Sequence, residues 1–273
     1  MPLRRWAGFA QPHPLVMGIV NVTPDSFSDG GRSHDPVATA FAMMEAGADL
    51  IDVGGESTRP GAAPVPVDVE IARVVPVIGR LAEAGVMVSV DTRNAETMRA
   101  ALAAGARIIN DVSALAHDPG SASVVARAGC QVVLMHMRGD PESMTKLSRY
   151  DDVAVDVLHE LQTRVAFAEA SGIDRVQIAI DPGIGFAKGA DANIALLQRL
   201  ELLTTLGLPM LVGVSRKGFI GRLSGEQDAA ARAPGSIAAA LWAVSKGASM
   251  LRVHDVSATV QAVRVWRGLS GLS

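Results

Sequence analysis

Val176-Gln-Ile-Ala-Ile-Asp-Pro-Gly-Ile-Gly-Phe-Ala-Lys188 is a short apolar run that ends in the carboxylate of Asp181 and continues into a glycine-rich loop. An apolar run bounded by Gly and Pro is typical of a strand buried on both faces, as parallel sheets require. An aspartate at the carboxyl end of such a strand lies at the rim of the core, where an unpaired charge is costly. Asp181 therefore needs either a structural partner or a ligand.

The same arrangement recurs along the chain. Other apolar runs end in polar groups at Asp52, Asp91, Asn110-Asp111 and His254-Asp255. One such residue is more often structural than functional. Five strands that end in this way indicate a shared, ligand-binding rim.

Length and composition limit the class of protein. The chain has 273 residues, which suits an α/β domain with a large core, and its net charge of -3 gives no general attraction to nucleic acid or anionic membrane. Cys130 is the only cysteine, so an intrachain disulfide is excluded, and we interpret it as a buried structural thiol rather than a nucleophile. No apolar stretch has the length of a signal peptide or a membrane span. We expect a soluble, cytoplasmic protein.

A regular spacing of glycines predicts the fold. Each of these glycines ends a helical pattern just before an apolar run, where it can adopt the left-handed conformation that closes a helix. They are Gly47, Gly85, Gly105, Gly129, Gly172, Gly207 and Gly247. With an initial strand they give eight predicted strands, at residues 16–20, 50–53, 86–91, 108–110, 132–136, 177–181, 210–214 and 250–253. We predict a single-domain (β/α)8 barrel over residues 15–273 after an N-terminal extension at 1–14, with a doubly wound open sheet as the alternative.

In a (β/α)8 barrel the functional site lies in the loops at the carboxyl ends of the strands. The loops at 21–31 and 54–61 fall at this end and are rich in Gly, Ser and Pro. Asp91, Asn110 and Asp181 supply hydrogen-bond acceptors there, which suits a flat heterocycle with several N–H donors. A structural network that ties strands together explains these three residues equally well.

Cationic groups gather after the last two strands. Lys217 lies in the loop after the seventh strand, and Arg252 and His254 close the eighth, where this barrel commonly binds phosphate. Arg59, in the second loop, is a further candidate. Asn21 ends the first strand and offers an oxygen to Mg²⁺, which takes most of its remaining ligands from water and phosphate.

Several other chemistries lack their signatures. The sequence has no G-x-x-x-x-G-K-[ST] and no H-E-x-x-H, and Gly183-Ile-Gly-Phe-Ala lacks the third glycine of a dinucleotide-binding loop. Asp52 and Glu56 are a conceivable carboxylate pair, but nothing in the sequence fixes a separation suited to glycoside hydrolysis.

Taken together, the loops closely resemble dihydropteroate synthase. The matching stretches are M-G-I-V-N-V-T-P-D-S-F-S-D-G-G, D-V-G-G-E-S-T-R-P-G-A, S-V-D-T, I-N-D-V-S-A, V-L-M-H-M-R-G, D-P-G-I-G-F-A-K, V-G-V-S-R-K-G-F-I-G and L-R-V-H-D-V, between Met17 and Val256. The departures are small: Gly218 stands where Ser is frequent, and the loop after His136 differs in its polar residues.

The resemblance implies a transferase of folate biosynthesis. It would condense 6-hydroxymethyl-7,8-dihydropterin diphosphate with p-aminobenzoate, releasing diphosphate, and sulfonamides would compete for the aminobenzoate site. The pterin would contact Asp91, Asn110, Met135, Asp181, Phe186, Gly213 and Lys217. The diphosphate would contact Thr58, Arg59, Arg252 and His254, with Mg²⁺ held by Asn21. The p-aminobenzoate would lie beside Phe27, Pro60, Ser215 and Lys217.

The resemblance also implies dissociative chemistry, in which the C–O bond breaks before the aniline nitrogen attacks, so no covalent enzyme nucleophile is needed. The catalytic residues would be Asp29, Arg59, Lys217, Arg252 and His254, with Asp29 facing the developing positive charge. Members of the family are usually homodimers.

Two alternatives remain at this point. A pterin-binding methyltransferase needs the pterin pocket but not Phe27, Ser28, residues 58–60 or residues 215–217, all of which are present. A non-catalytic paralogue would bind pterin without turnover.

Overall fold

Eight parallel strands form a barrel in the computed structural model, which describes residues 5–10, 14–23, 35–58 and 61–271. Their spatial order is β8-β7-β6-β5-β4-β3-β10-β9, and an isolated parallel bridge between Ile180 and Met210 joins the two edge strands. The strands are β3 (Leu15–Asn21), β4 (Leu50–Gly54), β5 (Val88–Asp91), β6 (Ile108–Asp111), β7 (Gln131–Met135), β8 (Ile178–Asp181), β9 (Leu211–Val212) and β10 (Met250–Val253). The predicted (β/α)8 barrel is confirmed.

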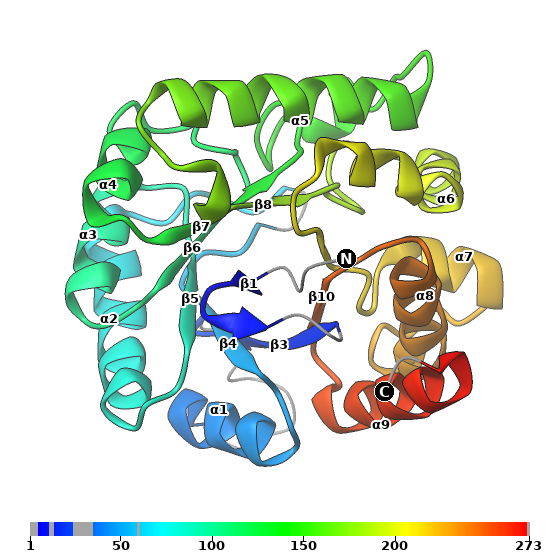
Figure 1. The fold of residues 1–273 in the computed structure, drawn as a ribbon, viewed down its shortest axis with the longest axis horizontal. Helices are drawn as coiled ribbons and strands as arrows, with labels where there is room; N and C mark the ends of the chain where they lie inside the picture. The colour runs from blue at the N-terminus through cyan, green and yellow to red at the C-terminus, as the bar shows by residue number, and fades with distance from the viewer. Residues whose placement is uncertain (1–4, 11–13, 24–34, 59–60, 272–273) are drawn as a thin grey trace.

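Helices alternate with the strands and surround them as an outer ring (Figure 1). They are α1 (Pro36–Glu45), α2 (Val67–Glu83), α3 (Ala95–Ala103), α4 (Ser121–Ala128), α5 (Val153–Ala170), α6 (Ala190–Gln198), α7 (Gly218–Ser224), α8 (Ala233–Ser245) and α9 (Val256–Ser270). Short 3-10 helices lie at η3 (Met144–Leu147), η4 (Arg175–Gln177), η5 (Leu200–Leu206) and η6 (Ala230–Arg232). Within the described ranges, no helix is long and apolar enough to cross a membrane.

The glycine pattern that predicted the fold is confirmed in the backbone. All seven of those glycines have positive φ angles, from 62° at Gly129 to 112° at Gly105. At Gly105 space matters too, because an added Cβ would lie 2.5 Å from the Cβ of Ala82. Only glycine adopts this conformation without strain, so each junction ends a helix and sends the chain back into the barrel.

Strand boundaries differ from prediction by a few residues. Gln177 belongs to η4 rather than to β8, because Asp174 and Gln177 form a reciprocal capping box there. The seventh strand is shorter than predicted: β9 is only Leu211–Val212, and Met210 makes an isolated bridge.

The amino end of the barrel is closed by an apolar plug. The hairpin of β1 (Arg5–Trp6) and β2 (Phe9–Ala10) places Trp6 inside the ring of strands, where it is 1% exposed and its Nε1 donates to the carbonyl of Gln177 at 3.2 Å. Figure 1 shows β1 at the centre of the ring. Trp6 packs with apolar residues at strand beginnings, including Leu15, Leu50 and Met250. The polar ends of the strands are therefore left for the opposite face.

Candidate active site

Side chains from four strands meet at the carboxyl end of the barrel. Arg252 Nε donates to Asp52 Oδ2 at 2.6 Å, and its Nη2 donates to Asp91 Oδ2 at 2.8 Å. Asn110 Nδ2 donates to the same Asp52 oxygen at 3.0 Å. Parallel pairing aligns these residues, since Asp91 lies opposite Gly54 on one side and Asn110 on the other. The predicted polar rim exists here, and it is partly an internal network.

The electrostatics of this group favour a ligand with N–H donors. Burial raises the pKa of Asp91 to about 7, against the opposing effect of Arg252. Burial disfavours the charged form of Arg252, but Asp52 and Asp91 raise its pKa above the usual value. Asp52 is fully buried, and its Oδ1 has no hydrogen-bond partner among the described residues. N–H groups of a ligand would supply hydrogen bonds to the desolvated Asp91 carboxylate and to the unpaired oxygen of Asp52 beside it.

Asp181 ends β8 and begins the glycine-rich loop. Its Oδ1 accepts from the Gly183 backbone N at 2.7 Å, and burial raises its pKa to about 6. Gly183 has φ 66°, and an added Cβ would lie only 1.9 Å from the His136 carbonyl oxygen. Only glycine fits this approach, so the loop after β8 packs directly on the end of β7.

Two predicted pterin contacts from different loops lie side by side. Lys217 Nζ is 4.2 Å from the centroid of the Phe186 ring, a cation–π geometry. Gly185 allows this, because a Cβ there would lie 3.0 Å from Lys217 Cδ. The loops after β8 and β9 therefore form one surface beside Asp181.

Ser215 holds His254 through two contacts. Ser215 Oγ accepts from the His254 backbone N at 3.2 Å and lies 2.9 Å from its Nδ1. Burial lowers the pKa of His254 to about 4, so the ring is neutral at pH 7. A neutral ring carries one N–H, and Nδ1 is the ring nitrogen that faces Ser215 Oγ.

Arg216, between Ser215 and Lys217, pairs with Asp255 and not with the rim network. Its φ of 60° is unusual for a residue with a side chain. A bidentate pair with Asp255, at 2.7 and 3.1 Å, and a bond from its N to Ser236 Oγ at 2.8 Å hold this conformation. Asp255 is thus structural. So is Asp111, which accepts from Ser113 and Leu115 in its own loop. These two carboxylates do not join the rim network, although Asn110, next to Asp111, does.

Asn21 lies at the end of β3 with an available oxygen. In the described part of the chain its side chain has no hydrogen-bond partner. A Cβ on Gly54 would lie 3.6 Å from Asn21 Oδ1 and 3.8 Å from Asp91 Oδ2, so glycine leaves a space between the two oxygens. The described residues contain no cluster of three His, Cys, Asp or Glu side chains that could hold a metal.

The remaining predicted residues are placed as follows. Met135 ends β7 and pairs with Asp181, and Gly213 follows β9, with Arg252 Cβ 3.9 Å from the position of an added Cβ. Thr58 is half-buried after β4. Four predicted residues lie outside the described part of the chain: Phe27, Asp29, Arg59 and Pro60.

Two participants were not among the predicted ligand contacts, although Asp52 was placed on the predicted rim. Asp52 joins Arg252 and Asn110, whereas Glu56 pairs with Arg93 at 3.2 Å, so the two carboxylates do not form a glycosidase pair. The position of Asp52 at the end of a strand was the sequence signal that placed it on the rim. Lys188 is buried beside Asp181, and no local pattern distinguishes a buried lysine from an exposed one.

Comparisons with known proteins show the family of the chain. The family model described as "Pterin binding enzyme" matches residues 17–254. The dihydropteroate synthase of Neisseria meningitidis serogroup C is 49% identical, covering 94% of this chain and 93% of that protein. A structure of Xanthomonas albilineans dihydropteroate synthase with 4-aminobenzoic acid is 50% identical, with a TM-score of 0.91 and coverage of 97% and 96%. The same enzyme in complex with 7,8-dihydropteroate is 48% identical, with a TM-score of 0.87 and coverage of 96% and 95%. The chain therefore belongs to the dihydropteroate synthase family.

Proposed function

We propose that this dihydropteroate synthase joins its two substrates by a dissociative reaction, in which the C–O bond to diphosphate breaks before the aniline nitrogen attacks the pterin methylene. The observation that carries the proposal is the composition of the site: buried carboxylates lie at the same carboxyl end of the barrel as Arg252, His254 and Lys217, and Arg252 pairs directly with Asp52 and Asp91. This arrangement suits a ring with N–H donors joined to an anionic leaving group.

The pterin ring would be held by acceptors. Asp91, Asn110 and Asp181 offer oxygens, and the two carboxylates are poorly solvated in the absence of a ligand. Charge-assisted hydrogen bonds of this kind contribute roughly 1.5 to 3 kcal/mol each. Met135 and Phe186 would contact the faces of the ring, and Gly213 would leave it room. Because the ionised carboxylate is the better acceptor, binding would release protons near pH 6.

The diphosphate would be held by donors. Arg252 is half-buried, and its Nε and Nη2 pair with Asp52 and Asp91, so Nη1 would face the diphosphate. His254 contacts Ser215 through Nδ1, so its Nε2 would face the diphosphate. Thr58 and Arg59 would complete the set from the second loop. Preorganised donors of this kind stabilise the charge that develops on a leaving group.

Mg²⁺ fits the donor set at Asn21. Its amide oxygen is the hard ligand that Mg²⁺ prefers, and Gly54 leaves space beside it. When bound, the ion would neutralise charge on the departing diphosphate. With so few protein ligands nearby, most of its coordination would come from water and the substrate.

The p-aminobenzoate would lie beside Lys217 and Ser215, bordered by Phe27 and Pro60, and sulfonamides would compete with it. Lys217 would thus contact both substrates and hold them in near-attack geometry. Asp29 would face the positive charge on the pterin methylene.

A homodimer and a cytoplasmic location complete the proposal. An apolar groove of about 390 Å³ lies between α8 and α9, lined in part by Leu241, Trp266 and Leu269. Leu269 and Val265 on this groove are 85% and 58% exposed, so the groove offers an apolar surface that a second subunit would cover. The single, buried cysteine suits a reducing compartment.

The test is to mix the purified protein with 6-hydroxymethyl-7,8-dihydropterin diphosphate, p-aminobenzoate and Mg²⁺, and to measure dihydropteroate and diphosphate. We expect both products in equal amounts, and none after Mg²⁺ is removed. Pterin binding without product would instead favour a non-catalytic paralogue.

A further inference from the structure

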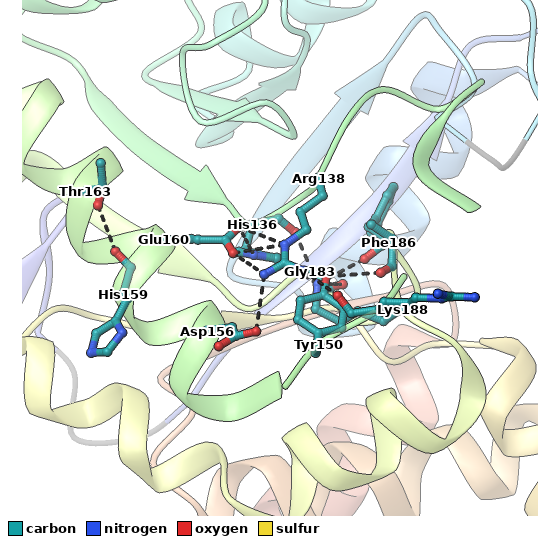
Figure 2. Close-up of polar contacts among 12 residues, drawn as sticks. His136, Arg138, Tyr150, Asp156, His159, Glu160, Thr163, Gly183, Phe186 and Lys188 are labelled. Carbon is teal, nitrogen blue, oxygen red and sulfur yellow. Dashed lines mark hydrogen bonds and ion pairs between the residues drawn. The ribbon is translucent and has the colours of Figure 1, made fainter. Parts of the chain in front are cut away.

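Lys188 is a lysine buried behind the proposed pterin pocket, with its side chain only 8% exposed. Its Nζ lies 2.9 Å from His136 Nδ1 and 3.0 Å from each of the carbonyl oxygens of Gly183 and Phe186 (Figure 2). The His136 carbonyl oxygen, at 3.4 Å, is a fourth and longer contact. The three shorter contacts match the three N–H groups of an ammonium. The contacts join two segments, since His136 follows β7 and the other two residues lie in the loop after β8.

His136 connects Lys188 to the outer helix α5. Its Nε2 lies 3.0 Å from Glu160 Oε2, and burial lowers its pKa to about 4, so the ring is neutral. Since Lys188 donates to Nδ1, the proton of the ring is on Nε2 and is donated to Glu160. Glu160 is also paired with Arg138, and bonds from His136 and Arg138 lower its pKa to about 2. Figure 2 shows this chain of contacts ending at Asp156.

The loop that Lys188 holds has an unusual backbone. Gly183, Gly185 and Ala187 have φ angles of 66°, 83° and 49°, so alternate residues are left-handed. Such a conformation persists only where the surroundings determine it strongly. Besides the contacts of Lys188, Tyr150 donates its hydroxyl to the Ala187 carbonyl at 3.0 Å, and Asn193 accepts from Gly185 N at 2.7 Å.

We propose that Lys188, through His136, is a positioning residue for the pterin pocket, fixing the separation of Met135 and Phe186 by tying the end of β7 to the loop after β8. Met135 directly precedes His136, and the carbonyl of Phe186 is one of the three acceptors. The inference rests on the pterin site proposed above.

The cost of burying Lys188 supports a positioning role over simple stabilisation. Burial lowers its pKa to about 7, although Asp181 and Glu160 favour the charged form. An apolar residue would fill the same space without desolvating a charge, and buried charges often add little net stability. What the ammonium adds is directed hydrogen bonding, because its three closest acceptors come from two segments and surround one nitrogen.

The test compares Lys188→Met with Lys246→Met, a matched control that removes a lysine paired with Glu201 on the outer surface. Asp181→Asn serves as the reference for loss of the pocket itself. Titration calorimetry measures binding of 6-hydroxymethyl-7,8-dihydropterin, steady-state kinetics give the KM for each substrate, and circular dichroism confirms folding. If Lys188→Met does not fold, His136→Leu replaces it, since it removes the Nδ1 acceptor and the contact with Glu160 but leaves the carbonyl acceptors of Lys188 in place.

For Lys188→Met we expect pterin affinity to fall by between about tenfold and 100-fold, as a misplaced contact implies. The KM for the pterin diphosphate should rise, while the KM for p-aminobenzoate and the control variant stay near wild type. Unchanged pterin affinity in a folded variant, with Asp181→Asn impaired, would overturn the inference alone. If wild type fails to bind pterin, or Asp181→Asn binds it normally, the proposed pterin site is wrong.

Discussion

The two ends of the barrel are built from the same eight strands but carry opposite chemistry. At the amino end, Leu15, Leu50 and Met250 begin their strands and pack around Trp6. At the carboxyl end, the buried Asp91 and Asp181 end their strands, and burial raises the pKa of each. Apolar closure stabilises the fold, whereas desolvated carboxylates at the other end reduce stability and are suited to a ligand. Changes at one end should therefore affect unfolding, and changes at the other should affect binding.

The largest expected effect is on stability, from Trp6→Ala. Removing this fully buried ring leaves a cavity in the plug, and Trp→Ala changes in cores cost about 3 to 5 kcal/mol. Urea denaturation should show this loss, while pterin affinity of the folded protein stays unchanged. Trp6→Phe is the milder control, losing mainly the bond to the Gln177 carbonyl, which is worth about 1 kcal/mol. A large loss of pterin affinity in folded Trp6→Ala would mean that the two ends are coupled.

Asp181→Asn is the converse change at the carboxyl end. Asparagine can still accept from Gly183 N, so the loop is retained, but the charge that binds pterin N–H groups is lost. Losing about 1.5 to 3 kcal/mol of charge-assisted bonding weakens pterin binding by roughly tenfold to 150-fold. Titration calorimetry gives the affinity, and a thermal melt should be unchanged or slightly raised. Collapse of the apo fold with normal affinity would assign Asp181 a structural role instead.

At the carboxyl end, the stability of the fold and the affinity for pterin should depend on pH with opposite signs. Burial raises the pKa of Asp181 from 3.8 to about 6, so the native state holds a proton that the unfolded state loses. The favourable contribution of this group is complete below pH 3.8 and is lost as pH rises through about 6. Pterin binding reverses the trend, because N–H donors favour the ionised carboxylate.

We therefore expect pterin affinity to increase between pH 5 and 7, with net proton release near pH 6. Calorimetry in two buffers of different ionisation enthalpy measures the released protons. Asp181→Asn should reduce the release, and Trp6→Phe should not alter it. Proton uptake on binding would show that the carboxylate is the protonated partner.

The features of the fold and site that could be predicted from the sequence are those with a signal in neighbouring residues. A glycine before each strand is a local signal, so it located the junctions of the barrel, and strand-ending polar residues located its functional end. The ion pair of Asp52 with Arg252 joins positions 200 residues apart and has no local signature. Lys188 is similar, since only the packed structure shows that its ammonium is buried. The ligand roles of all the site residues remain predictions, and Phe27, Asp29, Arg59 and Pro60 also lie outside the described part of the chain.

The smallest expected effect is that of Cys130→Ala. Cys130 directly precedes β7, at the amino end, and its carbonyl accepts from Gln177 Nε2 at 2.9 Å, a backbone bond that alanine preserves. Burial raises the pKa of its thiol to about 11, so the group stays protonated at neutral pH and is a poor nucleophile. Losing one buried sulfur should cost about 1 kcal/mol or less in unfolding. Turnover should stay near wild type because the proposed chemistry occurs at the other end and uses no thiolate. An assay of the folded variant decides this, since complete loss of activity would place a nucleophile at the apolar end and remove the division of labour between the two ends.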